Sequence, residues 1–329
     1  MSAPISRRAF LKGGLAAAAT AAVAAPAVRV EAAGTGRHLA TLIDISKCIG
    51  CGACVAACRE ANAAKFPTPE KPFPRMYPER VQVSDWSERQ EVDDRLTPYN
   101  WLFIQEVSVE HQDETFELTI PRRCMHCVNP PCVKLCPWGA ARQYANGISR
   151  IDTDMCLGGS KCQNVCPWDI PQRQTGDGLY RKLLPSLAGN GIMNKCDRCY
   201  DAVAKGGAPA CIEACPEAVQ TIGPREAMIA RAQALARATG GYLYGIEENG
   251  GTNTIYHSMV PFEAINRAIQ AGPGQPHLGP AADRMAAANN IGWAMLVAPL
   301  AGAAAAAGRI VKAGRRAAAP ADAGKPGSN

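Results

Sequence analysis

The sequence has few aromatic residues, and it lacks the residue patterns of several enzyme classes. Phe, Trp and Tyr make up 6% of the 329 residues, and hydrophobic residues make up 47%. This composition excludes a protein that is wholly embedded in a membrane. The chain has no G-x-G-x-x-G run followed by an acidic residue, no C-x-x-C-H haem motif and no pairing of a nucleophile with a base. These absences argue against an active site on this chain.

The net charge of +6 is concentrated at the two ends of the chain. Lys and Arg outnumber Asp and Glu in residues 1–33 and again in residues 309–329, and the residues between them are close to neutral. Proteins that bind nucleic acids carry their basic residues in patches on the folded body. The sequence therefore predicts no nucleic-acid partner, and it assigns the cations to targeting and anchoring segments.

Residues 1–33 have the features of a twin-arginine signal peptide. Arg7 and Arg8 belong to the run S-R-R-A-F-L-K, which precedes an alanine-rich apolar stretch and small residues up to Ala33. The alternative is an ordinary Sec signal peptide that happens to contain two arginines. Because the twin-arginine route exports folded proteins, it suits a chain whose cofactors are inserted in the cytoplasm. We expect the mature protein on the periplasmic side of the inner membrane.

Residues 284–308 are predicted to form a C-terminal transmembrane helix. Between Arg284 and Arg309 lie 24 uncharged residues, and about 20 apolar residues suffice to span a bilayer. The cations of residues 309–329 follow directly, as the positive-inside rule expects for a cytoplasmic tail. The alternative is a helix that is buried in the protein or loosely docked on it.

Cysteine is abundant: the chain has 15 cysteines, an odd number, and all of them lie in four short groups. Group one has the spacing C-x₂-C-x₂-C-x₃-C, group two has two additional residues before its third cysteine, and group four has a long excursion there. Group three keeps the register of group one but has Gly159 at its second position. In chain order the groups are Cys48, Cys51, Cys54 and Cys58; Cys124, Cys127, Cys132 and Cys136; Cys156, Cys162 and Cys166; and Cys196, Cys199, Cys211 and Cys215.

This spacing is typical of iron–sulfur ligation. A C-x₂-C-x₂-C loop places three thiolates around one face of a cubane cluster, and the fourth cysteine ligates the other cluster in two-cluster ferredoxins. Zinc is the competing metal, because group four alone has paired C-x₂-C units with a longer spacer. A disulfide scaffold is the other alternative, and the odd cysteine count and the dense spacing argue against it.

With four such groups in this order, the chain resembles the four-cluster ferredoxin-type electron-transfer subunits of membrane-bound respiratory oxidoreductases. These include the beta subunits of formate dehydrogenase-N, dimethyl sulfoxide reductase and nitrate reductase. The HybA-type iron–sulfur subunit of hydrogenase-2 is the most similar, because it combines a twin-arginine signal, a C-M-H-C-like second group and a single C-terminal membrane helix. The resemblance covers roughly residues 38–240. It implies an α+β fold of two fused bacterial-type ferredoxin units with inserts.

The resemblance also implies which cysteines share a cluster, because groups one and four, and groups two and three, exchange their fourth ligands. Site 1 would comprise Cys48, Cys51, Cys54 and Cys215, and site 2 would comprise Cys196, Cys199, Cys211 and Cys58. Site 3 would comprise Cys124, Cys127, Cys132 and Cys166, and site 4 would comprise Cys156, Cys162 and Cys136, with Gly159 at the vacant corner. This assignment uses all 15 cysteines.

Gly159 leaves one iron of a site 4 cubane without a protein ligand. The expected product is a [3Fe–4S] cluster, which accompanies three [4Fe–4S] clusters at sites 1, 2 and 3. Nitrate reductase beta subunits are similar, because they have a residue other than cysteine at the corresponding position. The alternative is a [4Fe–4S] cluster whose fourth iron binds water or the Ser160 hydroxyl group.

The four groups are predicted to lie in one domain of residues 34–220, which has an insert at residues 59–123. Within the insert, residues 101–110 and 115–120 flank a polar turn and predict a β-hairpin. Residues 221–283 are predicted to be a C-terminal segment that covers the core.

In the covering segment, an apolar periodicity that begins near Pro224 and stops at Gly240 predicts one helix. A short helical patch is predicted at residues 261–269.

Three residues beside the cysteines are also conspicuous. His126 is expected to be a solvated or surface-packed loop residue, although it could hydrogen bond to a cluster. Trp138 and Trp168 are expected to pack in the core beneath a cluster, although they could act as electron relays.

The sequence thus predicts an electron-transfer subunit without an active site of its own. The resemblance implies two partners, namely an exported catalytic subunit like that of hydrogenase-2 and an integral membrane subunit that exchanges electrons with quinone. One alternative is the equivalent subunit of a molybdopterin oxidoreductase, of the formate dehydrogenase, DMSO reductase or polysulfide reductase type, or of a Dsr-type membrane complex. The others are an enzyme with its own site and a metal-storage scaffold.

Overall fold

The computed structural model describes residues 38–187, 189–270 and 272–286. The chain divides into two units, residues 1–37 and 38–329, and the description below concerns the described residues of the second unit. The predicted signal peptide at 1–33, the tail at 309–329 and most of the transmembrane helix predicted at 284–308 lie outside the described residues. None of the helices formed by the described residues has the length and hydropathy that crossing a membrane requires.

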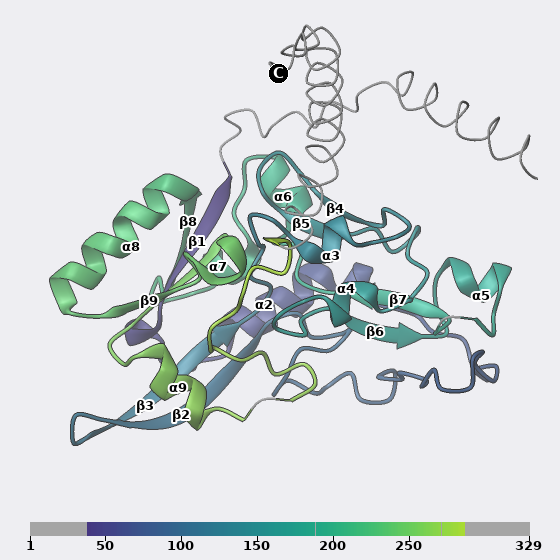
Figure 1. The fold of residues 1–329 in the computed structure, drawn as a ribbon, viewed down its shortest axis with the longest axis horizontal. Coiled ribbons are helices and arrows are strands. Elements are labelled where there is room, and N and C mark those ends of the chain that lie inside the picture. The colour runs from purple at the N-terminus through teal and green to yellow at the C-terminus, as the bar shows by residue number, and fades with distance from the viewer. Residues whose placement is uncertain (1–37, 188, 271, 287–329) are drawn as a thin grey trace, which may run out of the picture. The chain divides into compact units, whose positions relative to one another are not determined.

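A four-stranded sheet joins the first described strand to the C-terminal part of the chain (Figure 1). The order of the strands is β8–β1–β10–β9, with the bounds Gln220–Pro224, Leu39–Asp44, Thr254–Ser258 and Tyr242–Tyr244. Strand β1 pairs in parallel with β10 and antiparallel with β8. Because β1 lies inside the sheet, it is buried on both faces, which explains its mostly apolar sequence LATLID. Residues 221–283 therefore contribute β9, β10 and all but the first residue of β8 to the sheet that contains β1.

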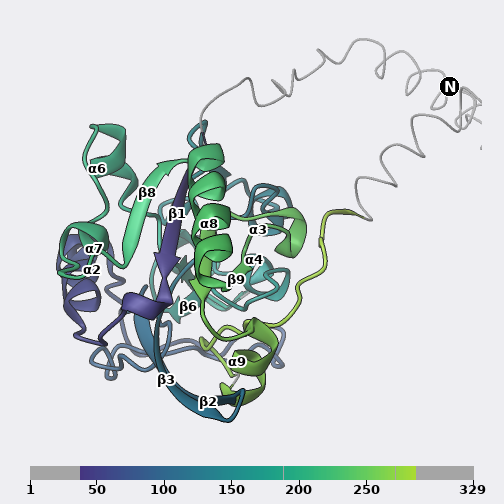
Figure 2. The same cartoon turned by 90° about the vertical axis from the view of Figure 1, so that its left-hand side faces the viewer.

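Helix α8 (Arg225–Thr239) packs against this sheet, as Figures 1 and 2 show. Leu42 of β1 packs on the helix side, where it joins Met228 and Ala232 in one apolar cluster. Ile43 points to the opposite face, where it joins the core that contains many of the cysteines. The alternation of side chains along β1 thus separates the helix interface from the cysteine core.

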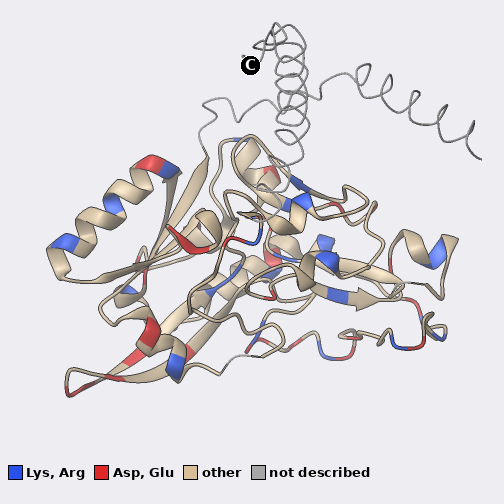
Figure 3. Cartoon of the chain, viewed as in Figure 1, with Lys and Arg blue, Asp and Glu red and all other residues tan. Residues whose placement is uncertain are grey.

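The predicted hairpin of the insert is confirmed, because β2 (Phe103–His111) pairs antiparallel with β3 (Glu114–Arg122). Gln112 and Asp113 form the two-residue turn, and both have positive φ angles, as a type I′ turn requires. Acidic residues lie on and beside this turn (Figure 3). Strand β3 ends two residues before Cys124, so the hairpin positions group two.

The remaining elements are short, and most of them flank the cysteine groups. Two further two-stranded antiparallel sheets pair β4 with β5 and β6 with β7. Helix α9 (Phe262–Ala268) confirms the short helix predicted in the covering segment. The other bounds are β4 Ala141–Gln143, β5 Ser149–Ile151, β6 Gln172–Thr175, β7 Gly191–Asn194, α2 Ala53–Asn62, α3 Pro131–Lys134, α4 Lys161–Asn164, α5 Leu179–Leu183, α6 Tyr200–Ala204 and α7 Ala210–Glu213, with 3₁₀ turns η1 Ile45–Lys47, η2 Ala63–Lys65 and η3 Glu248–Gly250.

Both predicted ends of α8 are confirmed, with Pro224 before its first residue and Gly240 after its last. Gly240 has φ 69°, in the left-handed region. A Cβ atom added at Gly240 would meet no other atom within 4 Å, so the backbone angle alone makes glycine preferable here.

Gly240→Ala is expected to lower the free energy of unfolding by about 1 kcal/mol, because it adds only the strain of a left-handed backbone. In a domain of this size, the apparent melting temperature should fall by about 2–4 °C. Anaerobic thermal unfolding followed by circular dichroism measures this change. Gly240→Asn is the control, since asparagine tolerates this region, and equal losses in the two variants would contradict the explanation.

Candidate metal centres

The four cysteine groups share one local architecture. In each group the cysteine at the third position of the motif lies in a short helix, and the cysteine at the fourth position follows four residues later. The helices are α2, α3, α4 and α7 for groups one to four. Residues four apart lie on the same face of a helix, about 6 Å apart along its axis. The third and fourth cysteines of one group can therefore serve two neighbouring sites.

A backbone turn with positive φ follows the first cysteine of every group. The residues two positions after that cysteine are Gly50 (φ 68°), His126 (φ 46°), Gly158 (φ 63°) and Arg198 (φ 55°). The backbone N–H groups of His126 and Arg198 donate to Sγ of Cys124 and Cys196, at 3.4 and 3.3 Å. Hydrogen bonds to the sulfur atoms are among the factors that set the potential of an iron–sulfur cluster.

Tertiary packing brings the cysteine groups together in crossed pairs. Helix α2 packs against α7, and helix α3 packs against α4. Group one therefore lies beside group four, and group two lies beside group three, although other groups separate one and four in the sequence.

Two small cavities are each bordered by four cysteines drawn from such a pair of groups. All four cysteines of site 1 border the first cavity, together with Glu217, Gln220 and apolar residues. All four cysteines of site 3 border the second, where Trp168 and Lys195 are among the other neighbours. In both cavities the fourth cysteine comes from the partner group and not from the group that supplies the other three.

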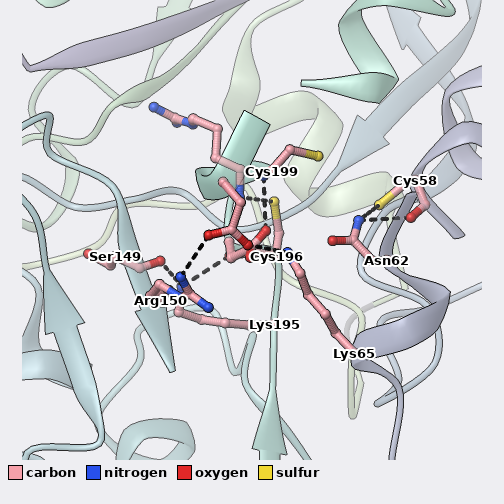
Figure 4. A network of polar contacts seen from close by, with 11 residues as sticks. Cys58, Asn62, Lys65, Ser149, Arg150, Lys195, Cys196 and Cys199 are labelled. Carbon is pink, nitrogen blue, oxygen red and sulfur yellow. Dashed lines mark hydrogen bonds and ion pairs between the residues drawn. The ribbon is translucent and has the colours of Figure 1, made fainter. Parts of the chain in front are cut away.

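The cysteines of site 2 are also brought together. Burial raises the pKa of the Cys58 thiol well above its ordinary value, and the nearby thiols of Cys196, Cys211 and Cys199 raise it further. Figure 4 shows Asn62, on the same helix, pointing at Cys58, with its amide nitrogen 3.8 Å from Sγ. These four cysteines therefore form a third quartet.

The three cysteines of site 4 lie together and close to site 3. Burial raises the pKa of the Cys162 thiol well above its ordinary value, and the thiols of Cys132, Cys156 and Cys136 raise it further. Cys156 also accepts a hydrogen bond from the backbone N–H of Met193, at 3.4 Å.

At each step from one site to the next, a thiol of one site is close enough to a thiol of the other to raise the pKa of that second thiol. These contacts connect site 1 to site 2, site 2 to site 3, and site 3 to site 4. The pairs are Cys54 and Cys211, Cys196 and Cys124, and Cys162 and Cys132. The four sites therefore form one series in the order 1, 2, 3, 4.

All 15 cysteines are free thiols, and Cys51 is exposed whereas the others are buried or half-buried. Burial raises the pKa of Cys132 to about 11, and that of Cys54 and Cys196 to about 12. Such thiols keep their protons at neutral pH until a metal displaces them. Among the described residues, no group of three or more His, Cys, Asp or Glu side chains is arranged to hold a single metal ion.

Several buried donors near the sites have no hydrogen-bond partner among the described residues. They include Nε and Nη2 of Arg123, Nε of Arg198 and Nε2 of His126. Leaving a buried donor unpaired costs about 1–3 kcal/mol. These donors fit a group that presents several acceptor atoms to the protein, as the thiolates and sulfides of an iron–sulfur cluster do. A zinc ion presents no acceptor of its own.

Two adjacent glycines in group three have different roles. A Cβ atom on Gly158 would lie 2.3 Å from the carbonyl oxygen of Gly191, so the close packing against β7 requires glycine there. Gly159 is exposed, its φ is not positive, and an added Cβ would meet no atom within 4 Å. Space and backbone angle would therefore both accept a cysteine at Gly159.

The loops of groups one and three have the same backbone turns. Both have positive φ two and four residues after the first cysteine, with Gly52 at 72° and Ser160 at 53° in the later position. Gly159 and the exposed Cys51 precede these residues, so they occupy equivalent places in the two loops.

The prediction that His126 is solvated or surface-packed is wrong. The side chain is 1% exposed, and its Nδ1 accepts a hydrogen bond from the backbone N–H of Ser149, at 3.2 Å. Burial lowers the pKa of His126 well below its ordinary value, and the nearby cations Arg198 and Lys195 lower it further. The ring is therefore neutral at physiological pH.

The prediction that both tryptophans lie in the core is confirmed for Trp168 and wrong for Trp138. Trp168 is buried, its Nε1 donates to the Tyr244 hydroxyl at 2.8 Å, and His277 stacks on it. These partners belong to the C-terminal segment. Trp138 is 57% exposed. The two tryptophans follow equivalent C-P pairs, but only Trp168 is covered by a distant part of the chain.

The sequence-based reasoning missed the charged residues that lie beside the cysteines inside the protein. Arg123, Lys195 and Arg198 are at most 5% exposed. Asp197 lies in the same loop, accepts the Cys199 backbone N–H at 2.9 Å, and pairs with Lys65 at 2.7 Å (Figure 4). The sequence could have indicated these charged residues by their position, because each lies within two residues of a cysteine in the runs R-R-C and K-C-D-R-C.

Comparison with known proteins agrees with this geometry. The 4Fe-4S dicluster domain matches residues 47–140 and 115–225, which together contain every cysteine of the chain. The twin-arginine translocation pathway signal sequence matches residues 4–24. The B subunit of the anaerobic dimethyl sulfoxide reductase of Escherichia coli (strain K12) is 35% identical over 182 residues, which are 55% of this chain and 71% of that protein. This chain is a member of the family of ferredoxin-type iron–sulfur subunits.

Two other relatives in this family are similar over longer stretches. The hydrogenase-2 operon protein HybA of Escherichia coli O157:H7 is 29% identical over 263 residues, 69% of this chain and 72% of that protein. The formate dehydrogenase-O iron-sulfur subunit of Escherichia coli (strain K12) is 32% identical over 226 residues, 67% of this chain and 66% of that protein. The predicted family and the predicted export signal are both confirmed. The chain is an iron–sulfur electron-transfer subunit that carries an export signal.

His126→Ala is expected to lower both the iron content and the melting temperature of this iron–sulfur subunit. Alanine at this left-handed angle is strained, and the buried N–H of Ser149 loses its acceptor, for a combined cost of about 2–4 kcal/mol. Iron analysis and anaerobic thermal unfolding measure the change. Asparagine tolerates the backbone angle and offers an acceptor, so His126→Asn should lose much less. The explanation fails if the two variants behave alike.

Proposed function

We propose that the chain relays single electrons between two partner proteins through four iron–sulfur clusters held in a series. The observation that carries this proposal is the order of the sites: α2 packs on α7, α3 packs on α4, and a thiol of one site is near enough to one of the next to raise its pKa. The proposed ligands are the cysteines of sites 1, 2 and 3, each of which holds a [4Fe–4S] cluster, and those of site 4, which holds a [3Fe–4S] cluster. The chain has no substrate chemistry of its own in this proposal.

The exposure of the sites supports the relay. The first and the last site of the series reach the surface, at the exposed Cys51 and at the exposed Gly159. Between them, Cys58, Cys196 and Cys211 of site 2 and three cysteines of site 3 are buried. Two surface ends and a dry interior suit a chain that receives electrons at one end and delivers them at the other.

The partners are proposed from the relatives. HybA belongs to the hydrogenase-2 operon, so we favour an exported hydrogenase-type catalytic subunit and a quinone-reactive membrane subunit. Residues 284–308 would anchor the chain as a transmembrane helix, with residues 309–329 in the cytoplasm. The folded part would comprise the cluster domain, residues 34–220, and the covering segment, residues 221–283. The relatives from formate dehydrogenase and dimethyl sulfoxide reductase make a molybdopterin catalytic subunit, or a Dsr-type complex, the second candidate.

Membranes from a strain that lacks this gene test the relay and its partner together. They should lose hydrogen-dependent quinone reduction and keep hydrogen-dependent reduction of a viologen dye, because the dye takes electrons directly from the catalytic subunit. Formate and dimethyl sulfoxide are assayed in parallel. Loss of one of those activities instead would identify a molybdopterin partner, and unchanged quinone linkage for all three substrates would overturn the relay.

Site 4 is proposed to hold three iron atoms because its loop keeps the shape of group one and lacks only the thiol of Cys51. Ser160 is the side chain that could replace the missing thiolate. Its hydroxyl instead lies 3.5 Å from the sulfur of Met193, to which it donates. This contact favours the three-iron cluster over a four-iron cluster with a hydroxyl ligand.

In air-oxidised protein, wild type should give the EPR signal of an oxidised [3Fe–4S] cluster, and Gly159→Cys should abolish it. The added thiolate completes the ligand set, and an added Cβ atom at Gly159 meets no atom within 4 Å. The iron content should rise by about one atom per chain. Ser160→Ala is the matched control and should keep the signal. A wild type that shows only four-iron signals after reduction would contradict the assignment.

A further inference from the structure

Arg123 connects two sites through its backbone and its side chain. Its sequence neighbour Cys124 belongs to site 3, but its side chain reaches site 2, where Nη1 donates to Sγ of Cys211 at 2.9 Å. Arg123 is 1% exposed, and its Nε and Nη2 have no partner among the described residues. Because a guanidinium group stays protonated inside proteins, a full positive charge lies against site 2.

Lys195 has the reciprocal arrangement. It directly precedes Cys196 of site 2, but its side chain lines the cavity that the four cysteines of site 3 surround. Its Nζ donates to the backbone carbonyl oxygens of Ser149 and Cys196, and the distance to the Cys196 oxygen is 3.1 Å. Figure 4 labels these three residues. Two carbonyl acceptors suit an ammonium group, which has three N–H donors and no acceptor.

Neither cation forms an ion pair with a carboxylate among the described residues. The acid nearest to them in the chain is Asp197, whose carboxylate lies 2.7 Å from Lys65. Asp197 is near enough to raise the pKa of Lys195 but forms no ion pair with it. A buried charge without a counter-charge in contact is costly, so the two cations fit a site that becomes negative when it is loaded. An iron–sulfur cluster with its cysteine thiolates is such a group.

We propose that Arg123 and Lys195 are a reciprocal pair of cations that raise the reduction potentials of sites 2 and 3, respectively. The inference rests on the proposed function, because it requires clusters at these sites. Reduction of a site adds one electron and one negative charge, and no bond of the protein forms or breaks. A cation at contact distance therefore stabilises the reduced state more than the oxidised state. The electron comes from a redox partner or, in a titration, from dithionite.

Arg122 provides a matched control one residue away. It is also buried, at 2% exposed, but it donates to the Gln105 side chain and, at 3.0 Å, to the carbonyl oxygen of His277. No hydrogen bond joins it to a cysteine among the described residues. Loss of the Arg122 charge should disturb packing without lowering the reduction potential of site 2.

The experiment is a potentiometric titration of the full-length, cluster-loaded chain, followed by EPR. Arg123→Gln removes the charge and keeps a hydrogen-bond donor, whereas Arg123→Lys keeps the charge. In Arg123→Gln, one reduction step should become at least about tenfold less favourable, which is about 59 mV for one electron. In Arg123→Lys, and in Arg122→Gln, that step should stay near its wild-type potential.

Lys195→Gln should shift a different reduction step in the same direction, and Lys195→Arg should restore it. The inference is overturned if the Gln variants leave every step in place, or if Arg122→Gln shifts the same step as Arg123→Gln. Loss of iron and sulfide from a Gln variant would also overturn it, in favour of a purely structural role. A wild-type chain without reversible steps would refute the proposed function itself, which separates the two failures.

Discussion

The structure depends on bringing fifteen thiols together, most of them buried or half-buried, in places where their sulfur atoms face one another. Such an interior is unfavourable for the protein alone, because burial and the nearby thiols raise the pKa of Cys58, Cys127 and Cys162 and hold them in their protonated form. Each site takes cysteines from two groups that are distant in the sequence, so ligation at a site also joins distant parts of the fold. Part of the free energy of metal binding is then free energy of folding.

The buried cations follow from the same constraint. Arg123, Lys195 and Arg198 lie among the thiols of sites 2 and 3. The carboxylate of Asp197, which lies between Cys196 and Arg198 in the sequence, is paired with Lys65. An excess of positive charge inside a protein is stable only beside groups that become anionic. The thiolates of a loaded site provide that charge, so the cysteines and the cations stabilise each other only when the metal is bound.

The two ends of the series differ from its middle. Sites 2 and 3 lie inside, under the β1 sheet, the β2–β3 hairpin and the C-terminal segment, whereas sites 1 and 4 each have one exposed corner. At site 1 the exposed corner is Cys51, and at site 4 it is Gly159. The same backbone loop therefore presents a thiol at one end of the series and no side chain at the other.

Local features of this chain could be predicted from its sequence, because they depend on residues close together in the chain. The four cysteine groups, the turn of the β2–β3 hairpin and the ends of α8 at Pro224 and Gly240 are of this kind. The packing of α2 on α7 and of α3 on α4, which brings the groups into crossed pairs, depends on the whole fold. The whole fold also determines burial, because His126 and Trp168 are covered by segments far away in the sequence, whereas Trp138, which follows an equivalent C-P pair, is exposed. Spacing determines which side chains can converge, but only the tertiary structure determines which of them are removed from water.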